Sequence, residues 1–405
     1  MRILAIETSC DETSMALVDI YRSNNLESIK IMIHGHFTAS QAQYHAQFGG
    51  VFPAMAKLEH IKACVPLIHS LFIESHASIP ESEWSKIDLT DEEKQVSSKI
   101  LHREPYIQTA LVAFCKKEKF PKIDFISVTN GPGLEPALWV GVNFARALGI
   151  ILKIPVVSEN HMLGHLYSSL LPIDELHTEI DLNTIPSSAL GLLVSGGHTQ
   201  IIQATDEKVK DKSTTEYKLL GNTLDDAVGE AFDKVARLLG LAYPGGKAIS
   251  ELAKIARDKN ITPVDLPRPM LHSKDYDFSY SGLKTAVMYY LRKFPITNEE
   301  DKLALALGFE NSAIEVIIKK TTKVIIDTGI SVVLLGGGVS ANTYLRSELK
   351  KAGEKYNFTI HYPLMSLTGD NALMIALTSG IRHIDRLPAD ESDTIKANGM
   401  LQIAS

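Results

Sequence analysis

Cysteine is scarce in this sequence. The chain of 405 residues has three cysteines, Cys10, Cys64 and Cys115, and none of them forms a Cys-x-x-Cys pair. A disulfide framework and a cysteine-rich zinc module are therefore excluded. The cysteine content is typical of a protein from a reducing compartment, so the sequence predicts a cytoplasmic location.

Long apolar runs are also missing. No stretch of about 18 apolar residues occurs, which is the length a membrane-spanning helix needs. The apolar run that follows Met1-Arg2 stops at Glu7 and is too short for the core of a signal peptide. The sequence therefore predicts neither a membrane segment nor secretion.

A strong excess of charge is absent as well, since the formal net charge is −7. Such a chain has no global attraction for phosphate backbones, so a nucleic-acid partner would need a local basic patch or a second protein. Two runs of lysines are candidates for such a patch: Lys116, Lys117, Lys119 and Lys122, and Lys319, Lys320 and Lys323. Runs of like charge are, however, more often solvated surface than binding sites.

The composition is that of an ordinary folded protein, with 45% apolar and 22% charged residues, and the length predicts about two or three domains. Residues 2–19 and 189–203 each read as two apolar strands joined by a small polar turn, and residues 331–342 as a buried strand entering a glycine loop. A helix is expected over 224–239, with Thr223 as its N-cap and Gly240 as its stop, and another over 343–351. This alternation predicts an α/β fold.

Three turns have the composition of a nucleotide or metal site. Ser195–Thr199 and Gly336–Gly338 could cradle phosphate with backbone N–H groups, although a triple glycine can also be a tight helix entry. The turn that carries Glu7, Asp11 and Glu12 is acidic, so it predicts a metal ion or a catalytic acid or base nearby. The alternative is that these side chains merely close the turn.

His161 and His165 are four residues apart and lie on one face if the segment is helical, close enough to share a metal ion. In the zinc-protease motif the residue after the first histidine is the general base, but here it is Met162, whose thioether cannot take a proton. A peptidase is therefore disfavoured. Asp370 is the best candidate for an anionic third ligand of iron or another divalent ion, and a helix N-cap is its alternative role.

Together these motifs resemble the tRNA threonylcarbamoyladenosine transferase family (TsaD), whose members were once filed as glycoproteases. The resemblance runs in order from the first strand to about residue 376 and leaves out mainly residues 75–120. It rests on Ile6–Thr13, His45, Phe48–Val51, Pro53, His60, Asn130–Leu134, Asn160–His165, Leu192–Thr199, Asp225–Lys234, Tyr243–Gly246, Phe278–Leu283, Gly336–Asn342 and Gly369–Asp370.

The resemblance implies the duplicated, two-lobed actin/Hsp70/sugar-kinase fold, which is ribonuclease H-like. We expect an N-terminal lobe over 1–155 with a surface insertion near 75–120, a C-terminal lobe over 156–385 with helical insertions, and a tail over 386–405. The most polar part of the insertion, 75–99, is expected to be dispensable for the core.

The activity implied by the resemblance is transfer of threonylcarbamoyl from threonylcarbamoyl-AMP to N6 of the adenosine beside the anticodon, in tRNAs that read ANN codons, with release of AMP. The resemblance assigns one divalent ion, Fe²⁺ with Zn²⁺ or Mg²⁺ as alternatives, to His161, His165 and Asp370. It assigns the adenylate to Leu193, Val194, Ser195, Gly196, Gly197, Asp233, Gly246, Ser250 and Asn342. Asp11 or Glu12 is the expected proton acceptor.

The resemblance also implies partners: tRNA, a paralogous TsaB-like subunit, a TsaE-like ATPase and an upstream TsaC-like adenylate synthase. The chain departs from the usual bacterial pattern at Asn160, which replaces a histidine, and at Leu163, which replaces a glutamate. Ala54, Leu58 and the Glu135-Pro136 pair depart as well. None of these changes removes a proposed ligand.

Two other readings stay open from the residues. An ATP phosphotransferase of the same superfamily would share the hairpins and glycine loops, but it has no use for an imidazole pair with a distant aspartate. A non-catalytic scaffold would lack the metal ligands, whereas His161, His165 and Asp370 are all present.

Overall fold

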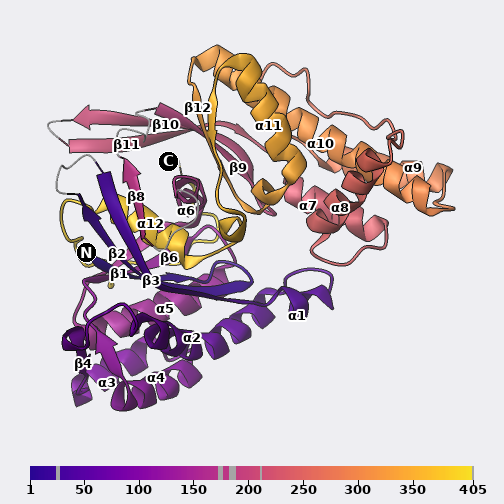
Figure 1. Cartoon of the computed structure of the whole chain (residues 1–405). Coiled ribbons are helices and arrows are strands. Elements are labelled where there is room, and N and C mark those ends of the chain that lie inside the picture. The colour runs from indigo at the N-terminus through magenta and orange to yellow at the C-terminus, as the bar shows by residue number, and fades with distance from the viewer. Residues whose placement is uncertain (24–27, 172–176, 182–187, 210–211, 404–405) are drawn as a thin grey trace. The chain divides into compact units, whose positions relative to one another are not determined.

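The computed structural model describes residues 1–23, 28–171, 177–181, 188–209 and 212–403 (Figure 1). The chain forms two compact units, Met1–Ile185 with Gly369–Ile403 and Pro186–Thr368. These units differ from the predicted lobes 1–155 and 156–385, because His161–Ser168 and Ala372–Arg382 pack on one another within the first unit.

The first unit is built on a six-stranded sheet in the order β7-β6-β1-β2-β3-β8. The predicted N-terminal hairpin is confirmed, since β1 and β2 pair antiparallel from Arg2 opposite Asp19 to Glu7 opposite Ser14. The strands of the unit are β1 (Arg2–Glu7), β2 (Glu12–Arg22), β3 (Ser28–Ser40), β4 (Trp84–Lys86), β5 (Lys119–Pro121), β6 (Phe125–Gly131), β7 (Val156–Asn160) and β8 (His177–Asp181). Its helices are α1 (Ala42–Ala46), α2 (Pro53–Ser75), α3 (Asp91–Ile100), α4 (Pro105–Lys117), α5 (Glu135–Leu152), α6 (His161–Ser168) and α12 (Ala372–Arg382).

Alternation along β2 explains why both faces of this sheet are covered. Met15 and Leu17 point into the core that α2 and α5 build. Ile20 points the other way, where a side chain on Gly380 of α12 would come within 2.2 Å of it. Helix α5 is long and apolar enough to cross a membrane, but 67% of it is buried inside this unit, as expected of a core helix.

Residues 75–120 do not form a surface insertion that the core could spare. Ile79, Trp84, Leu101 and Phe120 are all buried in the apolar core of the first unit. Helix α3 begins with a full capping box between Thr90 and Glu93. The prediction of a dispensable insertion was wrong because these apolar residues are spread between polar ones without a regular period. No amphipathic pattern therefore indicated that they are buried.

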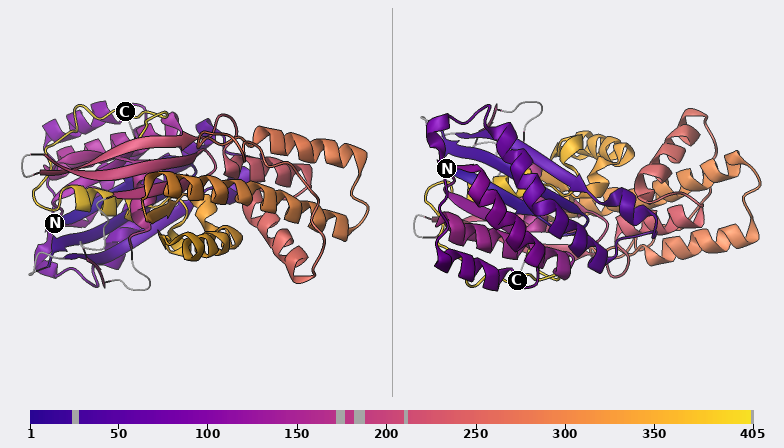
Figure 2. Two further views of the ribbon diagram at one scale, coloured as in Figure 1. Left: turned by 90° about the horizontal axis from the view of Figure 1, so that it is seen from above. Right: turned by 90° about the horizontal axis from the view of Figure 1, so that it is seen from below.

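The second unit has a five-stranded sheet in the order β11-β10-β9-β12-β13. Its strands are β9 (Ser188–Val194), β10 (Thr199–Val209), β11 (Lys212–Asn222), β12 (Val332–Gly336) and β13 (Thr359–His361). Its helices are α7 (Val228–Leu238), α8 (Gly245–Asp258), α9 (Ser281–Lys293), α10 (Glu299–Thr328) and α11 (Thr343–Tyr356), with a short 3-10 helix, η3 (Gly338–Ala341), after β12. Helices α7 to α10 pack on one another and group at one end of the strands of their unit (Figure 2).

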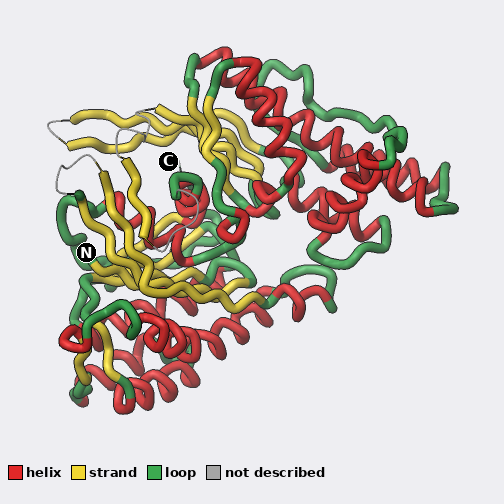
Figure 3. The backbone as a smooth tube through the Cα atoms, viewed as in Figure 1, coloured by secondary structure: helices red, strands yellow, loops and turns green. Residues whose placement is uncertain are grey.

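The two units repeat one topology. In each, three antiparallel strands (β1-β2-β3 and β9-β10-β11) are followed by two parallel strands (β6-β7 and β12-β13) that extend the sheet beside the first strand. Figure 3 shows the strands of both units in yellow. A single helix joins each parallel pair, α5 in the first unit and α11 in the second. The predicted duplicated α/β fold of the actin, Hsp70 and sugar-kinase type is thereby confirmed.

Helix α7 begins later than its sequence predicts. The helix was expected from residue 224 with Thr223 as the cap, but its N-cap is Ala227. Asp225 lies before the helix and not in its first turn. Its carboxylate accepts the backbone N–H of Tyr280 at 2.7 Å and so holds the start of α9. The end is as predicted, since Gly240 has a positive φ of 66°.

Neither lysine run is a free basic patch. Lys320 is 1% exposed and donates to Ser273 and to Asp275. In the other run, Lys119 pairs with Glu81. Local ion pairs therefore neutralise part of each run, and Lys320 is buried rather than part of a solvated surface.

We expect Trp84→Ala to lower the free energy of unfolding of the first unit by about 3–5 kcal/mol, because it empties a large buried site. The indole stacks on His76 with ring centroids 3.6 Å apart, and its Nε1–H donates to the Ile79 carbonyl at 3.3 Å. Urea denaturation measures the change. The matched control is Ile73→Ala on α2, where the side chain is 62% exposed and the expected change is within about 0.5 kcal/mol. Equal effects at both positions would contradict the burial of this segment.

Candidate metal centre and nucleotide-binding residues

Helix α6 presents the two histidines. Its N-cap is Asn160, whose side-chain oxygen accepts the backbone N–H groups of Met162 and Leu163 at 2.9 and 3.2 Å. Because the asparagine caps the helix, neither histidine is needed for that task. The rings of His161 and His165 lie edge to face with centroids 4.7 Å apart, as residues one helical turn apart on one face should.

Asp370 is not the N-cap of α12. That role belongs to Asn371, whose side chain accepts the Met374 N–H at 3.0 Å. The alternative that the sequence left open for Asp370 is therefore wrong, and its carboxylate is available for another role. Helix α12 brings it to α6 by close packing, since a side chain on Gly164 would come within 3.0 Å of Met374.

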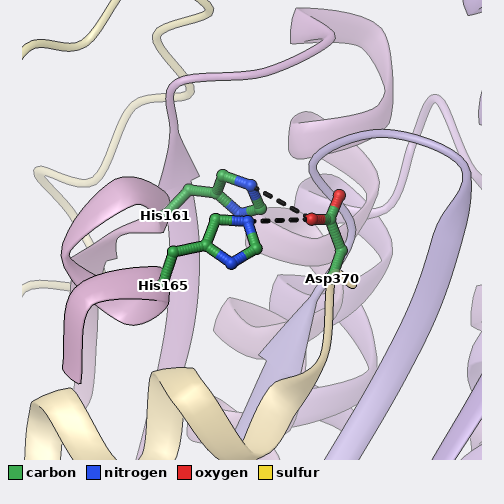
Figure 4. Close-up of side chains that lie close together, drawn as sticks. All are labelled: His161, His165 and Asp370. Carbon is green, nitrogen blue, oxygen red and sulfur yellow. Dashed lines mark hydrogen bonds and ion pairs between the residues drawn. The ribbon is translucent and has the colours of Figure 1, made fainter. Parts of the chain in front are cut away.

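The two imidazoles converge on one carboxylate oxygen (Figure 4). His165 Nε2 lies 3.1 Å and His161 Nε2 3.4 Å from Asp370 Oδ1. One donor atom from each residue can be chosen so that all three lie within 4.8 Å of one another. The separations of 3.1 and 3.4 Å are those that neighbouring ligands of one divalent ion have at bond lengths of about 2.0–2.2 Å, and the set of two imidazoles and a carboxylate suits iron or zinc.

Two residues of the acidic turn hold His161 from behind. Its Nδ1 lies 3.1 Å from Glu7 Oε2 and 3.1 Å from Ser9 Oγ. Glu7 is fully buried and also accepts the hydroxyl of Thr129. A ligating histidine commonly donates its second ring N–H to a carboxylate, which fixes the ring and leaves the other nitrogen free for metal. Glu7 is the residue placed to accept the Nδ1–H of His161. The two residues are 154 positions apart, so no local sequence pattern predicted that they would pair.

The electrostatics of the cluster favour a cation. Burial disfavours a charged imidazole, yet the carboxylates of Asp370 and Glu7 raise the pKa of His161 well above its ordinary value. Burial likewise opposes ionisation of the two acids, but the charge of His161 lowers the pKa of Asp370 and of Glu7. The fully buried carboxylate of Glu7 and the carboxylate of Asp370, which is only 18% exposed, therefore require positive charge between them.

Asp11 and Glu12 follow in the same turn. The backbone carbonyl of Asp11 accepts the N–H of Gln41 at 2.8 Å, and Ser40 Oγ donates to Glu12 at 3.3 Å. Burial, together with the negative charges of Asp370 and Asp11, raises the pKa of Glu12 to about 9. Part of this rise comes from the negative charge of Asp370, so a cation held by Asp370 would lower the pKa of Glu12 again.

In the second unit, the Ser195–Thr199 turn is held tightly from two sides. Ser195 Oγ accepts the N–H of His198 at 3.0 Å. A side chain on Gly229, at the start of α7, would come within 2.6 Å of the Ser195 carbonyl. A side chain on Gly337 would come within 2.5 Å of the Val194 carbonyl. Gly196 and Gly197 are exposed and have open space beside them, so the turn itself stays accessible.

Asp233 lies on α7 and reaches the start of α8. Its Oδ1 accepts the N–H of Gly245 at 2.7 Å, and its pKa is raised because burial outweighs the hydrogen bonds from Gly245 and Gly246. The carboxylate therefore serves the helix start and still has lone pairs for another donor.

Asn342 and Ser250 meet beside this helix start. The Asn342 side-chain oxygen caps α11 by accepting the Leu345 N–H at 2.8 Å, while its amide donates to Ser250 Oγ at 2.8 Å and to the buried Glu310 at 2.7 Å. Ser250 in turn donates to the Gly246 carbonyl at 2.9 Å. The second unit thus gathers Asp233, Gly246, Ser250 and Asn342 around α8, and Leu193–Gly197 at the start of α7. The acidic turn belongs to the first unit.

Comparison with known proteins agrees with these features. A family model described as tRNA N6-adenosine threonylcarbamoyltransferase (TsaD) matches residues 32–85 and 102–377. A protein of that name from Nitrosospira multiformis is 37% identical over 386 residues, which cover 94% of this chain and 91% of the relative. Another from Burkholderia ambifaria is 38% identical over 408 residues, covering 98% and 97%.

The chain belongs to the tRNA N6-adenosine threonylcarbamoyltransferase family. The resemblance drawn from the motifs is confirmed, and the enzyme is a transferase that modifies tRNA. Among solved structures, full-length HypF in its phosphate- and nucleotide-bound form has a TM-score of 0.48 and 12% identity, covering 94% of this chain and 46% of that one. At this level of similarity the fold assignment rests on the strand order itself.

We expect Gly337→Ala to destabilise the second unit of the transferase by more than about 1 kcal/mol, because the residue has a φ of 89° and no room for a methyl group. Gly338→Ala is the matched control, since no atom of the described residues lies within 4 Å of its added atom. Thermal unfolding of both variants measures the difference. A neutral Gly337→Ala variant would show that the β9–β10 turn is not packed as described.

Proposed function

We propose that the enzyme transfers threonylcarbamoyl from threonylcarbamoyl-AMP to N6 of the adenosine beside the anticodon, in tRNAs that read ANN codons, and releases AMP. The observation that supports this most is the convergence of His161, His165 and Asp370 in a chain of this family. A kinase has no need of such a donor set, and a non-catalytic scaffold has no need to keep it.

His161, His165 and Asp370 are the proposed ligands of one divalent ion, Fe²⁺ in our proposal, with Zn²⁺ and Mg²⁺ as alternatives. When bound, the ion would supply a Lewis acid that polarises carbamoyl or phosphate oxygens. Glu7 keeps the His161 ring oriented by accepting its Nδ1–H. The caps Asn160 and Asn371 hold the two helix starts that carry the ligands.

The second unit is the proposed adenylate holder. Leu193, Val194, Ser195, Gly196 and Gly197 offer backbone groups to the phosphate, and Asp233 accepts a ribose hydroxyl with the lone pairs that the start of α8 leaves free. Gly246 allows close approach beside it, and Asn342 with Ser250 completes the proposed site. Positioning contributes most to such a transfer because AMP is already a good leaving group.

Proton transfer is assigned to the acidic turn. The adenosine amine must lose a proton as it attacks, and Asp11 is the proposed acceptor. Glu12, in the same turn, is the alternative acceptor, because a cation held by Asp370 would lower its raised pKa.

The proposed setting is the cytoplasm, with no membrane partner. A TsaB-like paralogous subunit, a TsaE-like ATPase and a TsaC-like synthase that supplies the adenylate are the proposed protein partners. Binding of tRNA across several chains would account for the acidic net charge of −7.

The direct test of this function combines purified protein, synthetic threonylcarbamoyl-adenylate and unmodified tRNA, with and without the partners, and analyses the nucleosides by mass spectrometry. We expect threonylcarbamoyl on adenosine and an equal amount of AMP. An unmodified tRNA in every mixture, or a phosphorylated product made from ATP, would contradict the proposal.

Removal of a metal ligand should cost at least about 100-fold in transfer rate, because the Lewis acid is lost with it. The variants are His161→Ala and Asp370→Ala, measured by the same assay and by metal analysis of the purified proteins. His69→Ala is the control, since this imidazole is 43% exposed on α2 and lies outside the cluster. Wild-type rates in both ligand variants would show that the metal role is wrong.

Asp233→Ala should weaken AMP binding by about 10-fold or more, the cost of a hydrogen bond to a charged group. Asp233→Asn keeps an oxygen for the Gly245 N–H and so separates loss of the charge from loss of the helix start. Calorimetric titration with AMP measures both. Unchanged affinity in Asp233→Ala would remove this residue from the proposed site.

A further inference from the structure

The C-terminal tail beyond α12 pairs with an edge of the first sheet. Strand β7 is the last strand on its side, so its outer backbone groups need partners. The Glu391 N–H donates to the Val156 carbonyl at 2.9 Å, and the Val156 N–H donates to Asp390 at 3.0 Å. Glu391 also accepts the N–H of Ser158 at 3.0 Å. Ile395 is buried in the core, which anchors the tail further.

Further on, the tail contacts the loop between β6 and α5. The Asn398 N–H donates to the Asn130 carbonyl at 2.8 Å, and the Gly399 carbonyl accepts the N–H of Gly133 at 3.2 Å. The approach is so close that a side chain on Gly399 would come within 2.7 Å of the Gly133 carbonyl. Any residue larger than glycine at 399 must therefore move this loop.

The same loop supports the acidic turn. The Leu134 N–H donates to the Ser9 carbonyl at 2.7 Å, and a side chain on Gly133 would come within 2.5 Å of that carbonyl. Ser9 Oγ is the group that lies 3.1 Å from His161 Nδ1 and 3.5 Å from Asp370 Oδ2. A continuous set of contacts thus leads from Gly399 through the backbone to Ser9, and from the Ser9 hydroxyl to the metal-ligand cluster.

A second contact leads from the tail to the start of α6. The Asn160 side-chain N–H donates to the Gln402 carbonyl at 3.4 Å while its oxygen caps the helix that carries His161. One amide therefore connects the tail carbonyl with the helix start.

We propose that the tail, residues 390–402, is a positioning element of the metal centre, acting through Gly133 and Ser9 on one side and through Asn160 on the other. The inference rests on the proposed metal role of His161, His165 and Asp370. The tail lies beyond residue 377, where the match to the family model ends. Its loss should weaken metal binding without removing a ligand.

The test measures the affinity for Fe²⁺ alone, under anaerobic conditions, and for Zn²⁺ alone, by calorimetry on proteins whose folding is checked by circular dichroism. Gly399→Ala is expected to weaken binding about 10- to 100-fold, the usual effect of disturbing the groups that orient ligands. Met400→Ala is the matched control, because the neighbouring side chain is 86% exposed, and it should bind as the wild type does.

Two more variants separate positioning from folding. Asn160→Asp keeps an oxygen for the helix start but loses the N–H donated to Gln402, so it should weaken metal binding at unchanged helix content. Deletion of residues 388–405 should do the same, and a synthetic peptide of that sequence added in trans should restore the affinity. In transfer assays, kcat should fall while the KM for the adenylate stays constant.

The outcomes are distinguishable. Wild-type metal affinity in folded Gly399→Ala, Asn160→Asp and truncated proteins would overturn this inference and leave the proposed function intact. A wild-type protein that binds neither ion would overturn the metal role itself and this inference with it. A deletion that lowers only the melting temperature, with metal affinity unchanged, would reduce the tail to a cover for the sheet edge.

Discussion

A single carboxylate oxygen, Oδ1 of Asp370, is the point at which the two proposed histidine ligands converge. It faces two imidazole nitrogens from a helix more than 200 positions earlier in the chain. A carboxylate that is largely shielded from water is unfavourable unless positive charge accompanies it, and the fully buried acid Glu7 increases that demand. These side chains need a cation among them, and the residues around them hold the ligands in place for it.

Neighbouring residues, and not the proposed ligands, cap the helices that carry the cluster. Two asparagines, Asn160 and Asn371, satisfy the backbone N–H groups at the helix starts, so the adjacent histidine and aspartate do not have to. Glycines at 133 and 164 let backbone segments approach closely enough to hold the acidic turn and the two helices together. In the second unit the division is different, because Asp233 and Asn342 hold helix starts themselves and keep only part of their bonding capacity for a ligand.

The sequence predicted much of this arrangement where the signal is local. The two hairpins, the glycine loop after β12 and the histidine spacing on α6 follow from short patterns, and the repeated strand grammar indicated the duplicated fold. Pairings across the chain could not be read in this way. No sequence pattern near Glu7 predicts its contact with His161. Likewise, no pattern near Asp370 shows that Asn371, and not Asp370, is the N-cap of α12. The buried segment around Trp84 was predicted to be surface because its apolar residues lack a period. The start of α7 was predicted too early because Asp225 accepts a hydrogen bond from Tyr280, which is distant in sequence.

The central claim is that His161, His165 and Asp370 hold one ion, and anomalous diffraction from crystals loaded with Fe²⁺ tests it most directly. The account predicts a single strong peak at the iron absorption edge, about 2.0–2.3 Å from an imidazole nitrogen of each histidine and from the Asp370 carboxylate. A peak elsewhere in the molecule, or none while His161 and Asp370 remain directly paired, would contradict it.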